Sequence, residues 1–293
     1  LKLLNEKGEF INAYDGAEVL AIAEADDYNF AEVDDLGKYH YDSTYIQKHI
    51  DSVLKLKLVN TDAIKAAKFK IVVDAVNSTG GMAVPALLEN LGVSCVPLYC
   101  EPNGHFPHNP EPLAEHLKEI SKLVVETNAD CGIVVDPDVD RLALVNEDGS
   151  MFGEEYTLVA CADYILSKEK GNTVSNLSSS RALREVTHKH GGQYFSSAVG
   201  EVNVVTQMKQ CKAIIGGEGN GGIIFPDSHY GRDSIVGIAL FLSLLAEKKM
   251  KCSELRATYP SFFMSKNKIQ ITTEIDVDMI LSAISKKYAH EDV

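Results

Sequence analysis

A turn near the middle of the chain sets both its architecture and its chemistry: Asp136-Pro137-Asp138-Val139-Asp140-Arg141. Apolar runs at 133–135 and 142–145 flank this turn and predict buried strands that enter and leave it. Three carboxylates this close together repel one another unless a cation neutralises them. Because alternate side chains of an extended or turning backbone point the same way, the three aspartates can converge on one ion. The run therefore predicts a hard divalent metal site at the end of a buried strand.

Arg141 stands directly beside this predicted metal site. Its planar guanidinium presents a rigid fork of donors that suits the oxygens of a phosphate. A metal ion next to such an arginine indicates phosphoryl chemistry.

Three other interpretations of the acidic run stay open at this point. Calcium-binding EF-hand loops also alternate acids, and Glu147 falls at the twelfth position of such a loop; that loop, however, needs Gly where Arg141 stands and helices where strand-like runs stand. The run could also be a solvated acidic turn. Finally, an aspartate pair of D-x-D spacing after an apolar strand would suit a metal-dependent phosphatase with Asp136 as its nucleophile.

The composition is that of an ordinary globular protein, with 45% hydrophobic and 24% charged residues. A formal net charge of −14 and the lack of any basic run argue against nonspecific binding to nucleic acid or anionic membranes. The sequence shows no membrane span or secretory leader and starts with Leu1, so we expect a fragment of a cytoplasmic protein. Six cysteines without C-x-x-C spacing are expected to be reduced: Cys95, Cys100, Cys131, Cys161, Cys211 and Cys252.

Strand-like and helix-like patterns alternate through the first half of the chain. Residues 1–57 are mostly polar and helical, without a complete strand–helix unit. From there we expect a strand over 69–74, a Gly80-Gly81 turn, a helix over 82–91, a strand over 94–98, a helix near 113–126, the strand that feeds the acidic run, a strand over 142–146 and a helix over 156–166. Such a series indicates a parallel sheet with helices on both faces, whose sites collect at the carboxyl ends of the strands.

A second, similar series follows. Its expected elements are a strand over 173–176, a helix over 181–190 capped by Ser178, Ser179 and Ser180, a strand over 193–198, a helix after Gly200, strands over 213–215 and 223–225, and a helix over 234–247. A strand over 266–272 and a helix over 277–288 start a further piece. The sequence thus predicts an α/β fold: tandem α/β domains with mixed, mostly parallel sheets covered by helices.

A glycine loop lies within the second series: Gly216-Gly217-Glu218-Gly219-Asn220-Gly221-Gly222. Its glycines permit positive φ angles and a close approach of the backbone to a ligand. Glu218 and Asn220 should project together, where a carboxylate and an amide could bind adjacent sugar hydroxyls. A strand follows, so this is not the dinucleotide-binding G-x-G-x-x-G motif, and a plain flexible hairpin stays open. Downstream, Asp233 suits a helix cap, whereas His229 and Arg232 could face the same cleft.

Together these motifs resemble those of the α-D-phosphohexomutase superfamily: the phosphomannomutases, phosphoglucomutases and phosphoglucosamine mutases. The family's Mg²⁺-binding D-x-D-x-D-R loop is matched by Asp136, Asp138, Asp140 and Arg141. Its G-E-x-[SN]-G sugar loop is matched by Gly217-Glu218-Gly219-Asn220-Gly221, and the segments 102–107 and 109–112 resemble a recurring stretch of the second domain. The match spans nearly the whole chain.

The resemblance implies an enzyme that interconverts hexose 1-phosphates and hexose 6-phosphates through a phosphoserine and a bisphosphate intermediate. It implies Mg²⁺ as cofactor on the three aspartates, Arg141 as a catalytic residue, and a mannose, glucose or glucosamine phosphate bound by Gly217, Glu218, Asn220, Arg232 and His229. It also implies the end of domain 1 over 1–57, a metal-binding domain 2 over 58–168, a sugar-binding domain 3 over 169–257 and the start of domain 4 over 258–293.

The chain also departs from the family pattern. The phosphoserine loop, of Thr-Ala-Ser-His-Asn-Pro type, does not occur, and residues 1–5 resemble the segment just after it. The last domain's phosphate-clamping loop is likewise missing. Many members carry His where this chain has Glu201 and Gly222, so neither position assigns the general acid/base, although Glu201 or His229 could substitute. We therefore expect a phosphomannomutase/phosphoglucomutase as parent enzyme, and this chain alone to fold without catalysing. Phosphoglucosamine mutase and a noncatalytic binding module are the alternatives.

Overall fold

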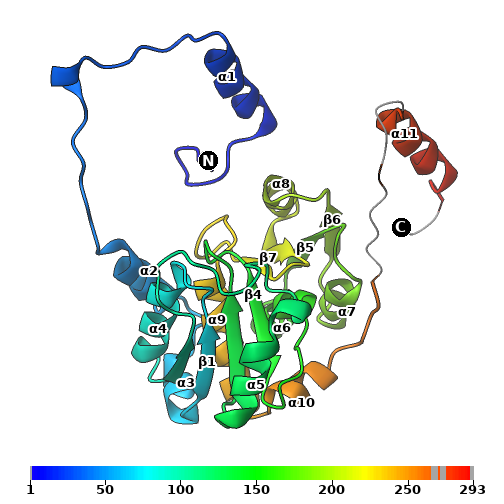
Figure 1. The fold of residues 1–293 in the computed structure, drawn as a ribbon. Helices are drawn as coiled ribbons and strands as arrows, with labels where there is room; N and C mark the ends of the chain where they lie inside the picture. Colours follow the sequence, from blue (N-terminus) through cyan, green and yellow to red (C-terminus); the bar gives the residue numbers. More distant parts are fainter. Residues whose placement is uncertain (1, 265–269, 271–274, 291–293) are drawn as a thin grey trace. The chain divides into compact units, whose positions relative to one another are not determined.

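The computed structural model describes residues 2–264, 270 and 275–290 of the chain, which divides into a large unit over 1–262 and a small unit over 263–293. Two four-stranded sheets lie in the described part of the large unit (Figure 1). The first has the order β2 (Ser94–Leu98), β1 (Lys70–Asp74), β3 (Cys131–Val135), β4 (Leu142–Asn146). The second has the order β6 (Tyr194–Ser197), β5 (Asn172–Asn176), β7 (Ala213–Glu218), β8 (Gly222–Ile224).

Both sheets repeat one topology. In each, three strands run parallel and the last strand in the chain, β4 or β8, pairs antiparallel with its neighbour at one edge. The predicted fold, with mixed and mostly parallel sheets covered by helices, is confirmed. Each antiparallel edge strand is reached through a tight loop, and these loops are the acidic run and the glycine loop.

The described part of the large unit contains ten α-helices, and those from α2 onward pack around and between the sheets. In chain order they are α1 (Ala13–Glu24), α2 (Tyr45–Val53), α3 (Thr61–Ala67), α4 (Gly80–Asn90), α5 (Lys118–Glu126), α6 (Glu154–Lys168), α7 (Ala182–Lys189), α8 (Glu201–Cys211), α9 (Ser234–Lys248) and α10 (Cys252–Ala257). Short 3₁₀ turns lie at Val33–Asp35 and Ala114–His116.

The two sheets share one hydrophobic core through α6 and α9. Helix α9 is apolar all round and buried along nearly its whole length, as expected for a helix that packs on every side. Helix α6 is buried from Tyr156 to Leu166 and contacts α9. One continuous cluster of buried side chains includes residues of β1, β3, β7, α6 and α9. This shared core holds the loops of the two sheets in a defined relation.

Three local predictions are wrong in detail. Gly80 and Gly81 open α4 instead of forming a turn; position 81 needs glycine because an added Cβ would lie 2.1 Å from the carbonyl oxygen of Cys100. Strand β7 extends through Gly217 to Glu218, so the loop proper is only 219–221. The N-cap of α7 is Arg181, and among the three serines only Ser180 accepts from a helix N–H, that of Ala182 at 3.3 Å.

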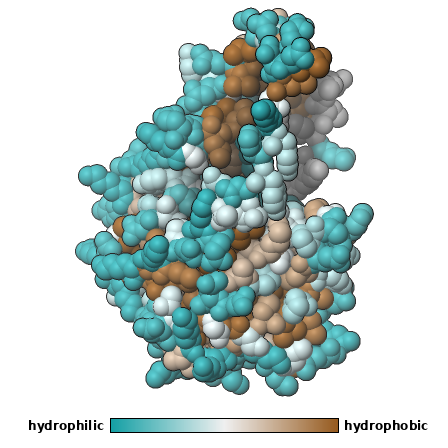
Figure 2. Space-filling view, turned by 90° about the vertical axis from the view of Figure 1, so that its left-hand side faces the viewer, coloured by the Kyte–Doolittle hydropathy of each residue, from teal (hydrophilic) through white to brown (hydrophobic). Residues whose placement is uncertain are grey.

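The segment before α2 contributes little to this core. Helix α1 has no buried residue, and large apolar side chains of the segment are exposed, including Tyr14, Leu20, Phe30, Tyr39 and Tyr41. Figure 2 shows hydrophobic surface interspersed with hydrophilic residues on one face of the molecule. Before α2, the helical elements are α1 and the short 3₁₀ turn at Val33–Asp35.

The small unit contains α11 (Val277–Lys287), which confirms the helix predicted over 277–288. The strand predicted over 266–272 lies outside the described residues, apart from position 270. All six cysteines are free thiols, and Cys131, Cys161 and Cys252 are buried. Among the described helices, none has the length and hydropathy that a membrane crossing requires.

Candidate active site

The acidic run and the glycine loop lie side by side, backbone against backbone. The N–H of Leu142 donates to the carbonyl of Gly221 at 3.1 Å. Gly221 has φ +88°, and a Cβ added there would lie 2.4 Å from the carbonyl oxygen of Leu142. Only glycine tolerates both the left-handed backbone and this close approach. The loops at equivalent edges of the two sheets therefore form one surface.

The acidic run is a tight turn and not an extended segment. Asp136 is 5% exposed, and its Oδ1 accepts the backbone N–H groups of Asp140 and Arg141, each at 3.0 Å. Val139, at the tip of the turn, has φ +61°. Carboxylate oxygens of Asp136, Asp138 and Asp140 all lie within 4.8 Å of one another. The three aspartates therefore converge within this turn.

Two hydroxyls hold the turn in place. The carbonyl of Pro137 accepts from Ser78 Oγ at 2.8 Å and from Thr79 Oγ1 at 2.7 Å. Thr79 immediately precedes α4, so the acidic run is fastened to the neighbouring strand–helix connection of its own sheet. The sequence offered no local sign of this contact, because serine and threonine before a helix ordinarily indicate a cap.

The charge balance of the turn favours a bound cation. Burial and the carboxylates of Asp140 and Asp138 raise the pKa of Asp136. The Oδ1 atom of Asp140 is buried without a hydrogen-bond partner. The Lys2 ammonium contacts Asp138 and lies 3.1 Å from Asp140 Oδ2. Burial alone would raise the pKa of Asp138, but Lys2 outweighs it and lowers this pKa. Clustered carboxylate oxygens, one of them unpartnered, fit a hard divalent cation such as Mg²⁺.

Arg232 joins the acidic run to the glycine loop. Its Nη2 donates to Asp140 Oδ2 at 2.7 Å, and its Nη1 donates to Glu218 Oε2 at 2.8 Å. Its Nε donates to Glu201 Oε2 at 2.9 Å, at the start of α8. All four side chains are largely buried. One guanidinium thus compensates three carboxylates, which come from the acidic run, from α8 and from the end of β7.

Glu218 and Asn220 lie together, as predicted, although Glu218 is already well hydrogen-bonded. Its Oε1 accepts from Asn176 Nδ2 at 2.7 Å and from the N–H of Gly200 at 3.3 Å. Its Oε2 accepts from Asn220 Nδ2 at 3.5 Å besides Arg232. Gly217 is buried within β7. The contact with Asn220 is the longest of these, so a ligand hydroxyl could replace it most easily.

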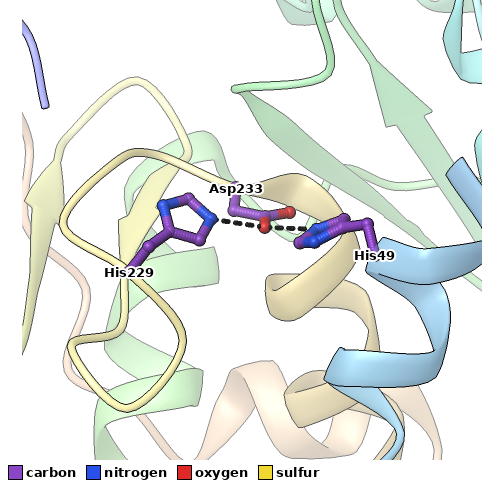
Figure 3. Close-up of side chains that lie close together, drawn as sticks. All are labelled: His49, His229 and Asp233. Carbon is purple, nitrogen blue, oxygen red and sulfur yellow. Dashed lines mark hydrogen bonds and ion pairs between the residues drawn. The ribbon is translucent and has the colours of Figure 1, made fainter. Parts of the chain in front are cut away.

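The remaining predicted residues lie at the edge of this network or outside it. Arg141 approaches Glu111 at 3.4 Å and Asp136 Oδ2 at 3.5 Å, and its Nε is buried without a hydrogen bond. The ring of His229 contacts Asp233, which the ring of His49 also contacts (Figure 3).

Glu201, one of the two residues that the sequence left open as general acid/base, lies within the Arg232 network. Burial raises the pKa of its carboxyl, while the guanidinium of Arg232 acts in the opposite direction. Glu201 also lines a cavity of about 170 Å³, between α8 and the N-terminal segment, with Lys209, Tyr230, Asn5 and Glu9. The carboxyl is therefore close both to the acidic run, through Arg232, and to open space.

Lys2 and Asn176 are contact residues that sequence reasoning missed. Lys2 is 136 positions from Asp138, and Asn176 is 42 positions from Glu218. Neither position has a motif of its own. Asn176 follows the pattern of a polar residue at the carboxyl end of a predicted parallel strand, which was the one available signal.

Two family models match the chain. The model for the phosphoglucomutase/phosphomannomutase alpha/beta/alpha domain II matches residues 47–149, and that for domain III matches residues 153–262. Together they cover well over half of the chain.

Relatives and solved structures agree with these matches. A "probable phosphoglucosamine mutase" of Methanopyrus kandleri is 30% identical over 270 residues, 91% of this chain and 59% of the relative. A phosphoglucomutase/phosphomannomutase of Thermococcus kodakarensis is 31% identical over 270 residues, with 92% and 59% covered. The crystal structure of a phosphoglucomutase/phosphomannomutase family protein from Burkholderia thailandensis has a TM-score of 0.74 at 25% identity, over 86% of this chain and 53% of that one. The chain thus spans 59% of the length of these two relatives.

Proposed function

Because the chain belongs to the phosphoglucomutase/phosphomannomutase family, we propose that it supplies the metal-binding and sugar-binding parts of a phosphohexomutase. The full-length enzyme would interconvert hexose 1-phosphates and hexose 6-phosphates. A phosphoserine outside these residues and a bisphosphate intermediate would carry the phosphoryl group. This chain alone would not catalyse the reaction.

The Arg232 bridge is the observation that carries this proposal. A guanidinium that holds Asp140 at 2.7 Å and Glu218 at 2.8 Å places the acidic run beside the glycine loop. A hexose phosphate needs cationic and metal-binding groups for its phosphate and a polar loop for its hydroxyls, within the length of one sugar. Both groups of residues lie here on one surface, as a mutase requires.

Each part of the surface has a proposed role. Asp136, Asp138 and Asp140 would hold Mg²⁺, which when bound supplies charge neutralisation for phosphate oxygens. Arg141, at the edge of the turn, would donate to the same phosphate. Glu218 and Asn220 would bind sugar hydroxyls, with Gly217 holding the backbone close. Positioning and electrostatics would then provide most of the catalysis.

We propose Glu201 as the general acid/base, in preference to His229. Its carboxyl lies in the Arg232 network and next to a cavity, and burial raises its pKa above the usual value, which favours proton uptake from a bound ligand. The Nε2 of His229 is engaged with Asp233 at 2.9 Å, so we assign this ring to Asp233 and not to the sugar.

The finer assignments are also proposals. Mannose, glucose and glucosamine phosphates share the hydroxyls that Glu218 and Asn220 could read, so phosphoglucosamine mutase stands beside phosphomannomutase/phosphoglucomutase. We retain the division at 57, 168 and 257 as the proposed domain boundaries. A cytoplasmic location is proposed from the six free thiols.

Phosphorus NMR of the full-length protein would test this function. With glucose 1-phosphate and Mg²⁺, the glucose 1-phosphate signal should give way to glucose 6-phosphate; mannose and glucosamine 1-phosphates, run in parallel, would rank the three sugars. The matched variants are Asp138→Asn, expected to be impaired, and the exposed Asp227→Asn, expected to be unchanged. Release of inorganic phosphate alone, with fluoroberyllate labelling of Asp136, would instead establish the phosphatase alternative.

A further inference from the structure

His49, His229 and Asp233 form a second cluster of metal-ligating side chains, separate from the three aspartates (Figure 3). One ligating atom of each lies within 4.8 Å of the other two. His49 Nε2 is 2.7 Å and His229 Nε2 is 2.9 Å from the same oxygen, Oδ2 of Asp233. The rings stand on either side of the carboxylate, with centroids 6.0 Å apart.

The carboxylate at the centre of this cluster is fixed by the backbone. Asp233 Oδ1 accepts the N–H groups of Ile235 and Val236, at 2.8 and 3.1 Å, and so caps α9. Its own N–H donates to Ile223 in β8 at 2.9 Å. With Oδ1 occupied by the helix, Oδ2 is the oxygen turned toward the rings. Such outer contacts are what orient a ligand before an ion binds.

The two histidines lie far apart in the sequence, and both are accessible. His49 belongs to α2, whereas His229 lies in the loop before α9. Their side chains are 36% and 42% exposed, while Asp233 is buried. Gly231 leaves room for the His229 ring, because a Cβ there would lie 3.0 Å from Nδ1. Solvent therefore reaches both rings and can supply the remaining ligands of an ion.

We propose that His49, His229 and Asp233 bind a zinc-type transition metal ion that links α2 to the start of α9. Two imidazole nitrogens and one carboxylate oxygen, with an open position for water, form a donor set typical of Zn²⁺. Imidazole donors disfavour Mg²⁺, which prefers oxygen ligands. The site therefore differs in chemistry from the acidic run, and it does not depend on the proposed mutase function.

This ion would also steady the Arg232 network. Arg232 immediately precedes Asp233, and the N–H of Ser234, which immediately follows it, donates to the Val139 carbonyl in the acidic run at 3.0 Å. An ion that fixes Asp233 thus fixes the segment that carries the bridge between the two loops. Its role would be structural, because no ligand in this cluster contacts the proposed sugar or phosphate groups.

Nitrogen NMR of the ¹⁵N-histidine-labelled chain, freed of metal with EDTA, distinguishes this site from binding at the aspartates. On addition of Zn²⁺ alone, we expect the ring signals of His49 and His229 to change together and to saturate at one equivalent. Mg²⁺ at the same concentration should leave both signals unchanged. Signals of His49 and His229 that respond to Zn²⁺ no more than the exposed His188 would overturn the proposal.

Variants provide a second readout. Replacing either ring, His49→Gln or His229→Gln, should weaken Zn²⁺ binding by about tenfold or more. Removing a residue that merely hydrogen-bonds to a metal ligand already lowers affinity by that much, and removing the ligand itself should lower it further. The matched control His188→Gln should bind as the wild type does. Zn²⁺ should raise the unfolding temperature of the wild type and of the control but not of the ligand variants. Equal Zn²⁺ affinity in all four proteins would contradict the site; if a variant does not fold, the wild-type NMR titration decides.

Discussion

Arg232 carries more of the candidate site than any other single side chain. It is only 11% exposed and faces the carboxylates of Asp140, Glu201 and Glu218. Burying three negative groups around one positive group costs desolvation energy that their mutual contacts offset. Removing the guanidinium leaves the carboxylates close together and uncompensated. The residue therefore links stability to the geometry of the site.

Replacing Arg232 should destabilise the chain strongly. We expect Arg232→Ala to lower the free energy of unfolding by about 3–5 kcal/mol, the usual cost of breaking a buried ion pair from one side. Arg232→Lys should lose less, because it keeps the charge but not the planar fork. Urea denaturation measures both, with Lys122→Ala, which breaks an exposed pair with Glu126, as the control. A loss no larger than that of the control would contradict this account of Arg232.

Asp138 should affect metal binding much more than folding. Its side chain is 48% exposed, unlike those of Asp136 and Asp140. We expect Asp138→Asn to weaken Mg²⁺ binding by about tenfold or more, because affinity at oxygen sites follows the number of charged ligands. Calorimetric titration measures this, with Asp227→Asn as an exposed control outside the turn. Unchanged Mg²⁺ affinity would show that the turn is a solvated acidic cluster.

At the scale of elements, the two edge loops meet because a glycine lets them. The hairpin between β7 and β8 places Gly221 against Leu142 with a left-handed backbone, φ +88°. Gly104 has a similar backbone, φ +75°, but an added Cβ there would have nothing within 4 Å. Substitutions at Gly104 and Gly221 can therefore be compared to separate the free-energy cost of backbone strain from the cost of crowding the two loops.

Alanine at these glycines should reveal the loop contact. Gly104→Ala should cost about 1–2 kcal/mol of unfolding free energy from the left-handed backbone alone. Gly221→Ala should cost about 1–3 kcal/mol more, because its Cβ must displace the Leu142 carbonyl. Chemical denaturation of both variants gives the comparison. Equal losses would mean that the loops are not in tight contact.

Helix α9 is fastened at its far end by Glu247. Its carboxylate accepts from Lys168 of α6 at 2.6 Å and from Asn60, the cap of α3, at 2.9 Å. Burial alone would raise the pKa of Glu247, but the hydrogen bonds from Lys168, Asn60 and Tyr164 outweigh it, so its pKa lies below the usual 4.5. A depressed carboxyl pKa stabilises the fold above the unfolded value and ceases to do so as the pH falls through the folded value.

Glu247→Gln should therefore show a pH-dependent loss of stability. At pH 7 we expect it to cost about 0.5–1 kcal/mol, the scale of a partly exposed ion pair. In acid, below the folded pKa, wild type and variant should unfold with the same free energy. Urea denaturation at both pH values measures the difference, and Glu126→Gln serves as a surface control. A cost that stays constant into acid would refute the role assigned to this carboxylate.

For the whole molecule, the order of strands and helices was predictable because most strands contain a short apolar run and are separated by stretches of helical periodicity. The acidic run was identified for the same reason: its charges interrupt two buried strands. What joins the two sheets was not predictable. Arg232 is 92, 31 and 14 positions from its three partners, and no local pattern encodes such distances. The contact between His229 and Asp233 was not predictable either, because the spacing of two residues in a loop does not tell which way a ring points.

The central claim is that one guanidinium joins the acidic run and the glycine loop into a single site. A double-mutant cycle on the free energy of unfolding tests it directly, with Asp140→Asn, Glu218→Gln and the double variant. We predict that the two effects are coupled by about 1 kcal/mol or more, since residues that share a partner depart from additivity by 0.5–3 kcal/mol. Effects that add to within about 0.5 kcal/mol, as distant independent sites do, would contradict the claim.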